Sequence, residues 1–266
     1  MDVGFLYELS ASYLIVLAMT AVRIAGAFLV TPLFTDELVP PLIKNSIFVA
    51  LGVVVTFVHP PVDIDAFSGA QLVALFTKEI FIGIALGFFF GFFLWAFESA
   101  GMVIDTQIGA SMAMVYDPIS GHQVTLYGDF IGRWVHYLFV AAGGFMFFII
   151  AILESFIIWP LDEYLPDFRL ASVALFEAEF GAFATLVVMI AAPVIVVILI
   201  VDFCLGLVNR FAKRLDIVFV SMAIKNLTGL LMVLILLPMI AHILYEQLDR
   251  HNAELLLILD QVLSTN

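Results

Sequence analysis

Long apolar runs with few polar interruptions dominate the chain. Spanning a bilayer takes about 20 apolar residues, within a usual range of about 17–25. Five runs reach or approach that length, residues 9–35, 80–97, 134–153, 180–201 and 226–245, and a sixth, residues 45–58, is short for a span. No segment alternates with period two, as the strands of a barrel do. The pattern therefore predicts an all-α, multi-helix membrane-type protein with five long helices and one or two short ones.

The most polar and least regular stretch lies at the centre of the chain, in residues 105–123, DTQIGASMAMVYDPISGHQ. Its glycines and the Asp117-Pro118 pair preclude one straight helix, because proline lacks a backbone donor and the residue before it avoids the α region. Ser120-Gly121 adds a second turn signal. The stretch therefore predicts a broken helix rather than a continuous span.

We expect a helix up to about Gln107, a bent loop over residues 109–121, and a second helix from about Thr125. Irregular backbone at membrane depth is tolerated where it is buried in protein or lines a water-filled cavity. A hydrophilic loop outside the membrane is the alternative interpretation.

Two shorter segments look amphipathic. In the acidic segment 154–179, four apolar side chains fall near one helical face and predict a short interfacial helix: Phe168, Val173, Phe176 and Phe180. A solvated loop is the alternative there. Beyond Glu246, acids flank LLLIL, which is consistent with a short helix that docks on a partner.

The composition supports a membrane protein. The chain of 266 residues is 64% hydrophobic and 12% charged, with a mean hydropathy of +1.17, whereas a soluble domain is about 25% charged. The net charge of −13 argues against nucleic acid as a partner, because phosphate binding needs clustered Lys and Arg. Without repeats or linkers, residues 1–266 read as one domain.

Loop charges give a weak orientation. The loops that follow the first, third and fifth apolar runs carry six basic residues and are expected to be cytoplasmic: Lys44, Arg133, Arg210, Lys213, Arg214 and Lys225. The opposite side carries Lys78, Arg169 and Arg250.

Glycines form a stripe in the run GIALGFFFGFFLWAF. Gly83, Gly87 and Gly91 repeat every four residues, so they lie on one helix face. Small residues at this spacing let two helix backbones approach closely. Gly143-Gly144 is expected to do the same in the fourth helix. Whether the packing partner lies in this chain or in another subunit stays open.

Several charges lie within or beside the apolar runs: Arg23, Glu98, Asp105, Asp202 and Lys225. A charge at the centre of a spanning helix costs at least about 2.5–3.5 kcal/mol, so such residues usually pair or face water. Arg23 is expected to pair with Asp202 or Asp105. Alternatively, these runs do not lie in lipid once the protein is assembled.

Enzymatic chemistry is not indicated. Ser120, His122 and Asp117 lie within six residues of one another, with no nucleophile elbow or oxyanion-hole signature. No two histidines have the i, i+4 spacing of a helix-borne metal site. We therefore expect no catalytic residues, no metal and no cofactor.

Two segments resemble one family. Residues 87–130, GFFFGFFLWAFESAGMVIDTQIGASMAMVYDPISGHQVTLYGDF, resemble the signature region of the SctT (YscT/SpaR/EscT) family of type III secretion export-apparatus proteins, to which flagellar FliR proteins are more distantly related. Residues 218–229, VFVSMAIKNLTG, resemble the family's VFxLSMPxK element, with Ala223 in place of the proline. The form DPISGHQ points to the injectisome branch.

The resemblance implies a non-enzymatic subunit of the export gate in the bacterial inner membrane. Members of this family assemble with SctR-like and SctS-like subunits into a helical complex, with which an SctU-like protein associates. Unfolded secreted proteins pass through the centre, and hydrophobic helical hairpins pack against other subunits rather than lipid alone.

The resemblance also gives the central loop a role. We expect the 107–122 loop to help plug the channel at rest, with Glu98 and Asp105 anchoring its base. The residues assigned to the plug are Gln107, Gly109, Met112, Met114, Asp117, Pro118, Gly121 and His122.

Two other functions are compatible with so apolar a chain. A self-sufficient secondary transporter would be stable alone and would have paired broken helices. A membrane scaffold would anchor a complex without touching the substrate path.

Overall fold

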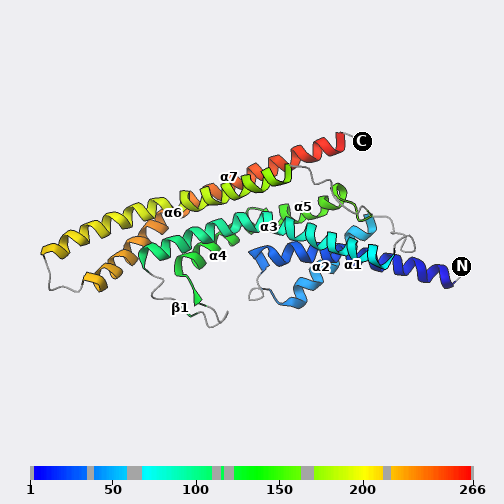
Figure 1. Ribbon diagram of the computed structural model, residues 1–266, viewed down its shortest axis with the longest axis horizontal. Coiled ribbons are helices and arrows are strands. Elements are labelled where there is room, and N and C mark those ends of the chain that lie inside the picture. The colour runs from blue at the N-terminus through cyan, green and yellow to red at the C-terminus, as the bar shows by residue number, and fades with distance from the viewer. Residues whose placement is uncertain are drawn as a thin grey trace. The chain divides into compact units, whose positions relative to one another are not determined.

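The computed structural model describes residues 3–34, 39–58, 68–109, 115–116, 123–162, 171–211 and 217–264, and these are helical almost throughout (Figure 1). The predicted all-α fold is confirmed. The helices are α1 (Val3–Val30), the 3₁₀ turn η1 (Pro32–Phe34), α2 (Pro41–Val58), α3 (Gly69–Ile108), α4 (Leu126–Ala141), α5 (Gly144–Ile158), α6 (Ala171–Phe211) and α7 (Ile217–Ser264). Two strands of two residues each, β1 (Val115–Tyr116) and β2 (Gln123–Val124), pair antiparallel.

The helix break at the centre of the chain falls where the sequence predicts it. α3 ends at Ile108, followed by Gly109 with a left-handed φ of +85°, and α4 begins at Leu126. Glycine takes positive φ without the penalty that a Cβ imposes, so it commonly ends a helix. The predicted boundaries near Gln107 and Thr125 are confirmed.

A second break separates α4 from α5, and here the prediction of one helix over residues 134–153 is wrong. Gly143 has a φ of +85°, and its N–H donates to the carbonyl of Val140 at 3.1 Å. This glycine therefore terminates α4 rather than smoothing a helix face, while Gly144 starts α5 at a point where an added Cβ would lie 2.6 Å from Cε2 of the Phe139 ring.

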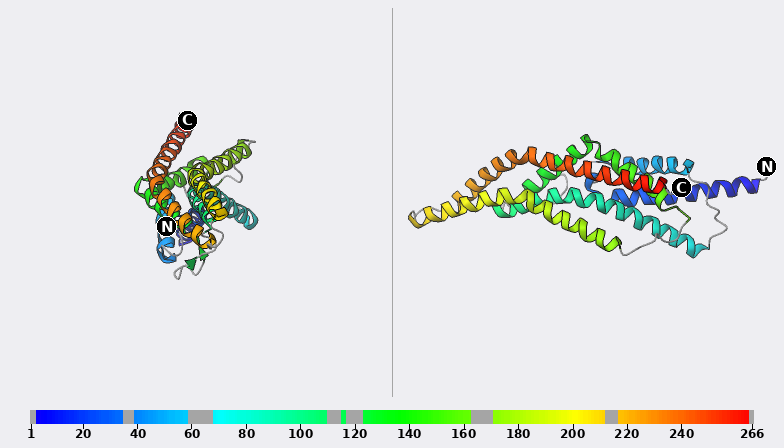
Figure 2. Two further views of the ribbon diagram at one scale, coloured as in Figure 1. Left: turned by 90° about the vertical axis from the view of Figure 1, so that its left-hand side faces the viewer. Right: turned by 90° about the horizontal axis from the view of Figure 1, so that it is seen from above.

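Two predicted short helices belong to long ones. α6 continues without interruption from Ala171 to Phe211, so Val173, Phe176 and Phe180 of the proposed interfacial helix belong to α6, whereas Phe168 lies outside the described residues. α7 likewise continues to Ser264, so the apolar tail after Glu246 extends this helix. Figures 1 and 2 show α6 and α7 running antiparallel as a hairpin.

Four helices are long and apolar enough to cross a membrane, judged by length and composition over the described residues. The candidate spans are Ser12–Val30, Gly69–Ile108, Glu177–Phe211 and Val220–Asp249. The bent pair α4 and α5 makes a fifth if the two are counted as one broken span. The shorter apolar helix α2 corresponds to the run predicted to be too short.

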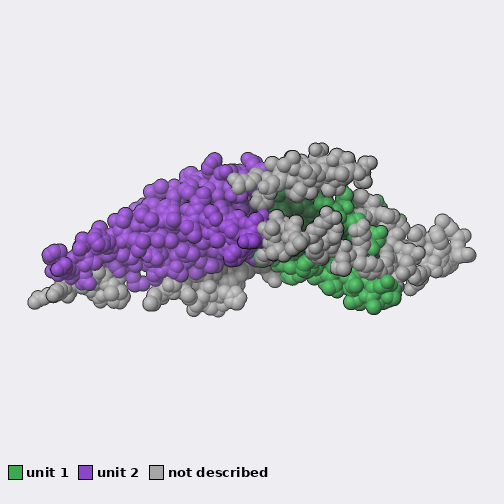
Figure 3. Space-filling model, turned by 45° about the horizontal axis from the view of Figure 1, so that its top comes forward, with its two compact units in different colours: residues 1–91, 145–176, 257–266 green, residues 92–144, 177–256 purple. Residues whose placement is uncertain are grey.

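The chain forms two compact units, coloured separately in Figure 3. Unit 1 contains residues 1–91, 145–176 and 257–266, and unit 2 contains residues 92–144 and 177–256. In unit 1, Phe28 of α1 packs against Phe148 of α5, with ring centroids 5.2 Å apart. In unit 2, Phe92 of α3 stacks on Phe183 of α6 at 4.5 Å.

The hairpin of α6 and α7 leaves many large apolar side chains uncovered. Phe203 and Ile235 are each 69% exposed, and Phe211 is 87% exposed. Soluble proteins rarely expose contiguous apolar patches of this kind without a partner. This surface therefore needs lipid or other subunits to cover it.

Candidate functional site

The connection between α3 and α4 contains the loop to which the sequence assigns a plug. Among its residues the structure describes Gly109, the two short strands and Thr125, and β1 pairs with β2 so that Val115 lies opposite Val124. Six of the predicted plug residues lie outside the described residues: Met112, Met114, Asp117, Pro118, Gly121 and His122.

Asp105 links the end of α3 to the start of α4. Its Oδ2 accepts hydrogen bonds from the backbone N–H groups of Tyr127 at 2.9 Å and Gly128 at 3.0 Å. These groups belong to the first turn of α4, where N–H groups have no partner within the helix. The hydroxyl of the N-cap residue Thr125 makes no capping bond, so a carboxylate from another helix caps α4 instead.

The charge of Asp105 also suits this position. A helix N-terminus carries a partial positive charge, which favours a carboxylate. Asp105 is 1% exposed, so little solvent screens that interaction. These bonds hold the two ends of the 107–122 loop together, and the predicted role of Asp105 as an anchor is consistent with them.

Glycines allow α3 and α4 to come close beside this cap. A Cβ placed on Gly101 would lie 2.6 Å from both the Cα of Gly128 and the carbonyl oxygen of Tyr127. Real Cβ atoms do not approach backbone this closely, so the crossing requires glycine at 101. The short distance between the helices is what lets the Asp105 side chain reach the α4 backbone.

A turn of α7 contacts both ends of the loop. The Tyr127 hydroxyl donates to the carbonyl oxygen of Asn226 at 3.0 Å. Gly229 faces Ile108, the last residue of α3, with Ile108 Cγ1 3.2 Å from the position of a Cβ at 229. Neither of these contacts is visible in the sequence pattern, because each joins residues that are far apart along the chain.

Glu98, the second predicted anchor, and Gln107, the first residue of the predicted plug, lie nearby on α3. Glu98 packs its aliphatic carbons against Gly132 of α4, two helical turns before Asp105. Gln107 is half-buried one residue before the end of α3. The anchoring role of Glu98 and the plug role of Gln107 stay predictions.

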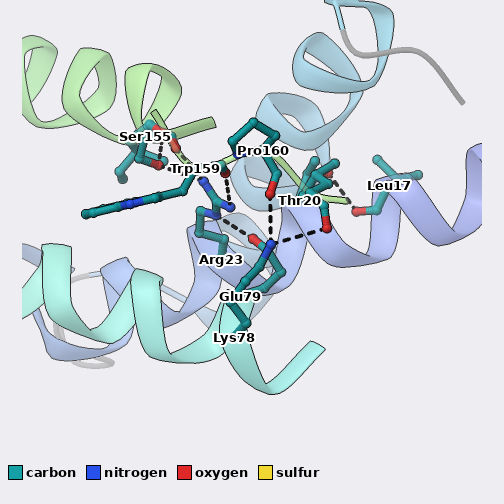
Figure 4. A network of polar contacts seen from close by, with 10 residues as sticks. Leu17, Thr20, Arg23, Lys78, Glu79, Ser155, Trp159 and Pro160 are labelled. Carbon is teal, nitrogen blue, oxygen red and sulfur yellow. Dashed lines mark hydrogen bonds and ion pairs between the residues drawn. The ribbon is translucent and has the colours of Figure 1, made fainter. Parts of the chain in front are cut away.

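The expected partner of Arg23 is wrong. Its Nε pairs with Oε2 of Glu79 on α3, not with Asp202 or Asp105 (Figure 4). Both side chains are fully buried. The guanidinium also donates from Nη1 to the Ser155 carbonyl at 2.8 Å and from Nη2 to the Trp159 carbonyl at 2.9 Å.

Lys78 joins the same cluster. Its Nζ lies 2.9 Å from Oε1 of Glu79 and donates to the carbonyls of Pro160 at 2.8 Å and Leu161 at 3.2 Å. Lys78 is 7% exposed within α3, so the interpretation of this residue as a loop charge is wrong. Arg23, Lys78, Glu79 and Ser155 form what we call the buried charge cluster.

Helix electrostatics explain why two cations meet one carboxylate here. The carbonyls that Arg23 and Lys78 bind lie in and just after the last turn of α5, which carries a partial negative charge. Arg23 also lies over the Phe156 ring, with its Cζ 4.0 Å from the ring centroid, a favourable cation–π arrangement. The buried charge cluster thus ties α1, α3 and the end of α5 together in unit 1.

The remaining two membrane-depth charges pair with each other. Lys225 Nζ on α7 lies 3.2 Å from Asp202 Oδ1 on α6, with the side chains 15% and 39% exposed. This ion pair connects the two helices of the hairpin. Arg23, Lys225 and Asp202 each pair with an opposite charge, and their position at membrane depth stays a prediction.

The glycine stripe packs within this chain. A Cβ on Gly83 would lie 3.0 Å from the carbonyl carbon of Arg23 and closer still to its oxygen, and a Cβ on Gly87 would clash with Ala27 in the same way. Gly26 of α1 faces back towards Gly83. Gly83 and Gly87 therefore pack against α1 of the same chain. Gly91 is also buried.

Among the described residues, no three His, Cys, Asp or Glu side chains gather in a way that could hold a metal ion.

The chain is similar to known bacterial export proteins along most of its length. A model of the family described as bacterial export proteins, family 1, matches residues 14–251. That range includes the connection between α3 and α4 and the part of α7 that contacts it.

Individual relatives are similar over most of the chain. The identity to the Yop proteins translocation protein T of Yersinia pestis is 29% over 225 residues, covering 83% of this chain and 85% of the relative. It is 28% over 237 residues to the surface presentation of antigens protein SpaR of Shigella flexneri, covering 88% and 90%. For the flagellar biosynthetic protein FliR of Bacillus subtilis it is 29% over 223 residues, covering 82% and 85%.

Proposed function

The chain belongs to the bacterial export proteins, family 1, and from this premise we propose that it is a non-catalytic subunit of a type III export gate in the bacterial inner membrane. It lines the channel for unfolded secreted proteins together with SctR-like and SctS-like subunits, and an SctU-like protein associates with the complex. The 107–122 loop helps to close the channel at rest. Relatives named for Yop translocation and for flagellar biosynthesis support the export role.

The observation that carries the proposal is the closed base of the 107–122 loop. Asp105 bonds the first turn of α4, so the loop leaves and re-enters the helices at one point. The Asp105 bonds therefore fix the two points from which the connection between α3 and α4 starts and ends. A fixed base supports a plug, because a plug must return to the same place after each substrate has passed.

The chemistry of the loop also fits a plug. A closed pore must stop small ions yet part for an extended polypeptide of any sequence. Met112 and Met114 supply unbranched, polarizable side chains that adapt to variable neighbours. A rigid helix at this position would seal less well around a moving chain.

The uncovered apolar surface supports assembly with other subunits. α6 and α7 carry exposed large side chains such as Phe203, Phe211 and Ile235. In a helical complex, neighbouring hydrophobic hairpins would cover them. Lipid covers whatever remains.

Deleting residues 110–119 tests the plug. We expect membranes that carry the assembled complex to become permeable to K⁺, because the shortened connection no longer reaches across the channel. K⁺ efflux is measured in cells that express the complete set of export subunits, and assembly is checked by co-purification. A second variant replaces the same ten residues with Gly and Ser at equal length and should also leak. Tight membranes with an intact complex would contradict the role of the loop.

Co-purification tests the subunit role and separates it from the transporter alternative. When a tagged form of this chain is expressed with its neighbouring secretion genes, we expect a large complex that contains SctR-like and SctS-like subunits. Expressed alone, the chain should be unstable or aggregated, since its apolar hairpin lacks partners. A well-behaved monomer or homodimer that ignores those subunits would favour a self-sufficient secondary transporter instead.

A further inference from the structure

A groove in unit 1, between α1, α2 and α3, has no part in the proposed function. It encloses about 510 Å³, within the range of about 300–1,000 Å³ that is usual for small-molecule sites. Six large apolar side chains line what we call the unit 1 groove: Val22, Phe28, Leu29, Phe48, Ile80 and Ile84. Because cavities with such a lining stay dry and bind apolar molecules, the groove suits an apolar ligand.

The apolar lining continues onto the outer surface of α1 and α3. Leu29 is 82% exposed, and Ile80 and Ile84 are 43% and 38% exposed. These residues belong to the candidate spans Ser12–Val30 and Gly69–Ile108. A groove that opens on two membrane spans is reached from the bilayer, where the abundant apolar ligand is a lipid acyl chain.

The polar part of the lining lies at the start of α2. This helix begins at Pro41, and Lys44 and Asn45 line the groove within the next turn, whereas none of the described lining residues is acidic. Lys44 brings a positive charge, the Asn45 amide can donate hydrogen bonds, and the N-terminus of α2 adds a partial positive charge. Basic pockets between transmembrane helices bind anionic lipid headgroups. An apolar groove with one cationic end therefore matches an amphiphile with an anionic head.

We propose that the unit 1 groove binds one anionic phospholipid from the surrounding membrane. One acyl chain lies along the apolar lining, and the phosphate lies beside Lys44 and Asn45. The lipid fills space that the side chains of three helices leave between them, so it contributes to the packing of unit 1. The inference goes beyond the proposed function and does not depend on the channel, because it requires only that the chain lies in a membrane.

A change of charge tests the headgroup end. The assembled complex is extracted in mild detergent, washed, and titrated with phosphatidylglycerol or with zwitterionic phosphatidylcholine, and bound lipid is counted by native mass spectrometry. One basic residue near an anionic membrane surface is worth about 5-fold in binding. We therefore expect Lys44→Gln to weaken phosphatidylglycerol binding about 5-fold and to leave phosphatidylcholine binding unchanged. Arg210→Gln removes one cation at an exposed position of α6 and should change neither; equal binding by Lys44→Gln and wild type would contradict the proposal.

A larger side chain tests the acyl-chain end. Ala25 also lines the groove, and Ala25→Leu puts three more carbon atoms where the acyl chain would lie. Binding of both phospholipids at this site should be lost, whereas Ala182→Leu, the same change at an exposed position of α6, should keep it. Wild-type binding by Ala25→Leu would place the lipid elsewhere. If this variant does not assemble, the result for Lys44→Gln decides.

A photoreactive benzophenone side chain introduced at position 29 identifies the occupant. Leu29 lines the groove and is largely exposed, so on illumination the probe captures whatever lies there. We expect an adduct with the mass of one phospholipid, reduced when Lys44→Gln is added. A crosslink to another export subunit, or no lipid adduct, would overturn the lipid site. The measurement is made on whichever particle the chain forms, so failure of the proposed subunit role leaves this test intact.

Discussion

Replacing Glu79 by glutamine should nearly abolish accumulation of the protein in membranes. The Glu79 carboxylate faces both Arg23 and Lys78, and all three side chains are buried. Removing one partner of a buried ion pair costs about 3–5 kcal/mol, because a charge is left uncompensated. The stability of an ordinary domain is about 5–15 kcal/mol in total. The amount of chain in membranes, with all export subunits present, and the Tm of the extracted complex measure the effect.

Glu177→Gln provides the matched control, since it makes the same chemical change at an exposed acid of α6. Both readings should stay at the wild-type level. Arg23→Met combined with Glu79→Leu should recover part of the loss, because one buried cation then remains instead of two, and this cation, Lys78, keeps its bonds to the carbonyls of Pro160 and Leu161. Wild-type abundance and Tm for Glu79→Gln would show that the pair contributes little.

Gly83→Ala should separate α1 from α3. The added Cβ meets the backbone carbonyl of Arg23 and lies 3.2 Å from the backbone N of Ala27. Backbone atoms inside a helix cannot rotate away as a side chain does, so the two helices must move apart. Overpacking costs about 1–3 kcal/mol, occasionally more. Here the cost rises further because Arg23 also reaches Glu79 across the same contact, so we expect a lower Tm and faster proteolysis of the assembled complex.

Gly206→Ala is the control for this change. A Cβ there has nothing within 4 Å, and alanine favours a helix by about 1 kcal/mol over glycine. This variant should keep or raise the Tm. Equal losses for Gly83→Ala and Gly206→Ala would attribute the effect to glycine in general and not to the α1–α3 contact.

Local signals made the helix ends around the central loop predictable. Gly109 and the Asp117-Pro118 pair restrict their own backbone, so their effect is read without knowing the fold. Gly143 carried the same kind of signal, but the apolar residues on both sides made it look like a packing position. The hydrophobicity of a run does not reveal a turn within it.

The partners of the buried charges could not be predicted from the sequence. Periodicity indicates which face of a helix a residue occupies, but not which helix packs there. Glu79 lies one residue before the apolar run 80–97, so the hydropathy pattern leaves it outside the helix, although α3 begins at Gly69. A basic and an acidic residue adjacent in an otherwise apolar stretch were the available signal.

The residues of the buried charge cluster leave the ribosome at different times. Arg23 and Glu79 are 56 residues apart, and Arg23 and Ser155 are 132 apart. At about 5–20 residues per second, the carboxylate follows the guanidinium out of the ribosome by about 3–11 s. Until then α1 carries a cation without a partner, and this charge disfavours its insertion into lipid. We therefore expect α1 to insert stably into the membrane only after α3 has been synthesised and Glu79 can pair with Arg23.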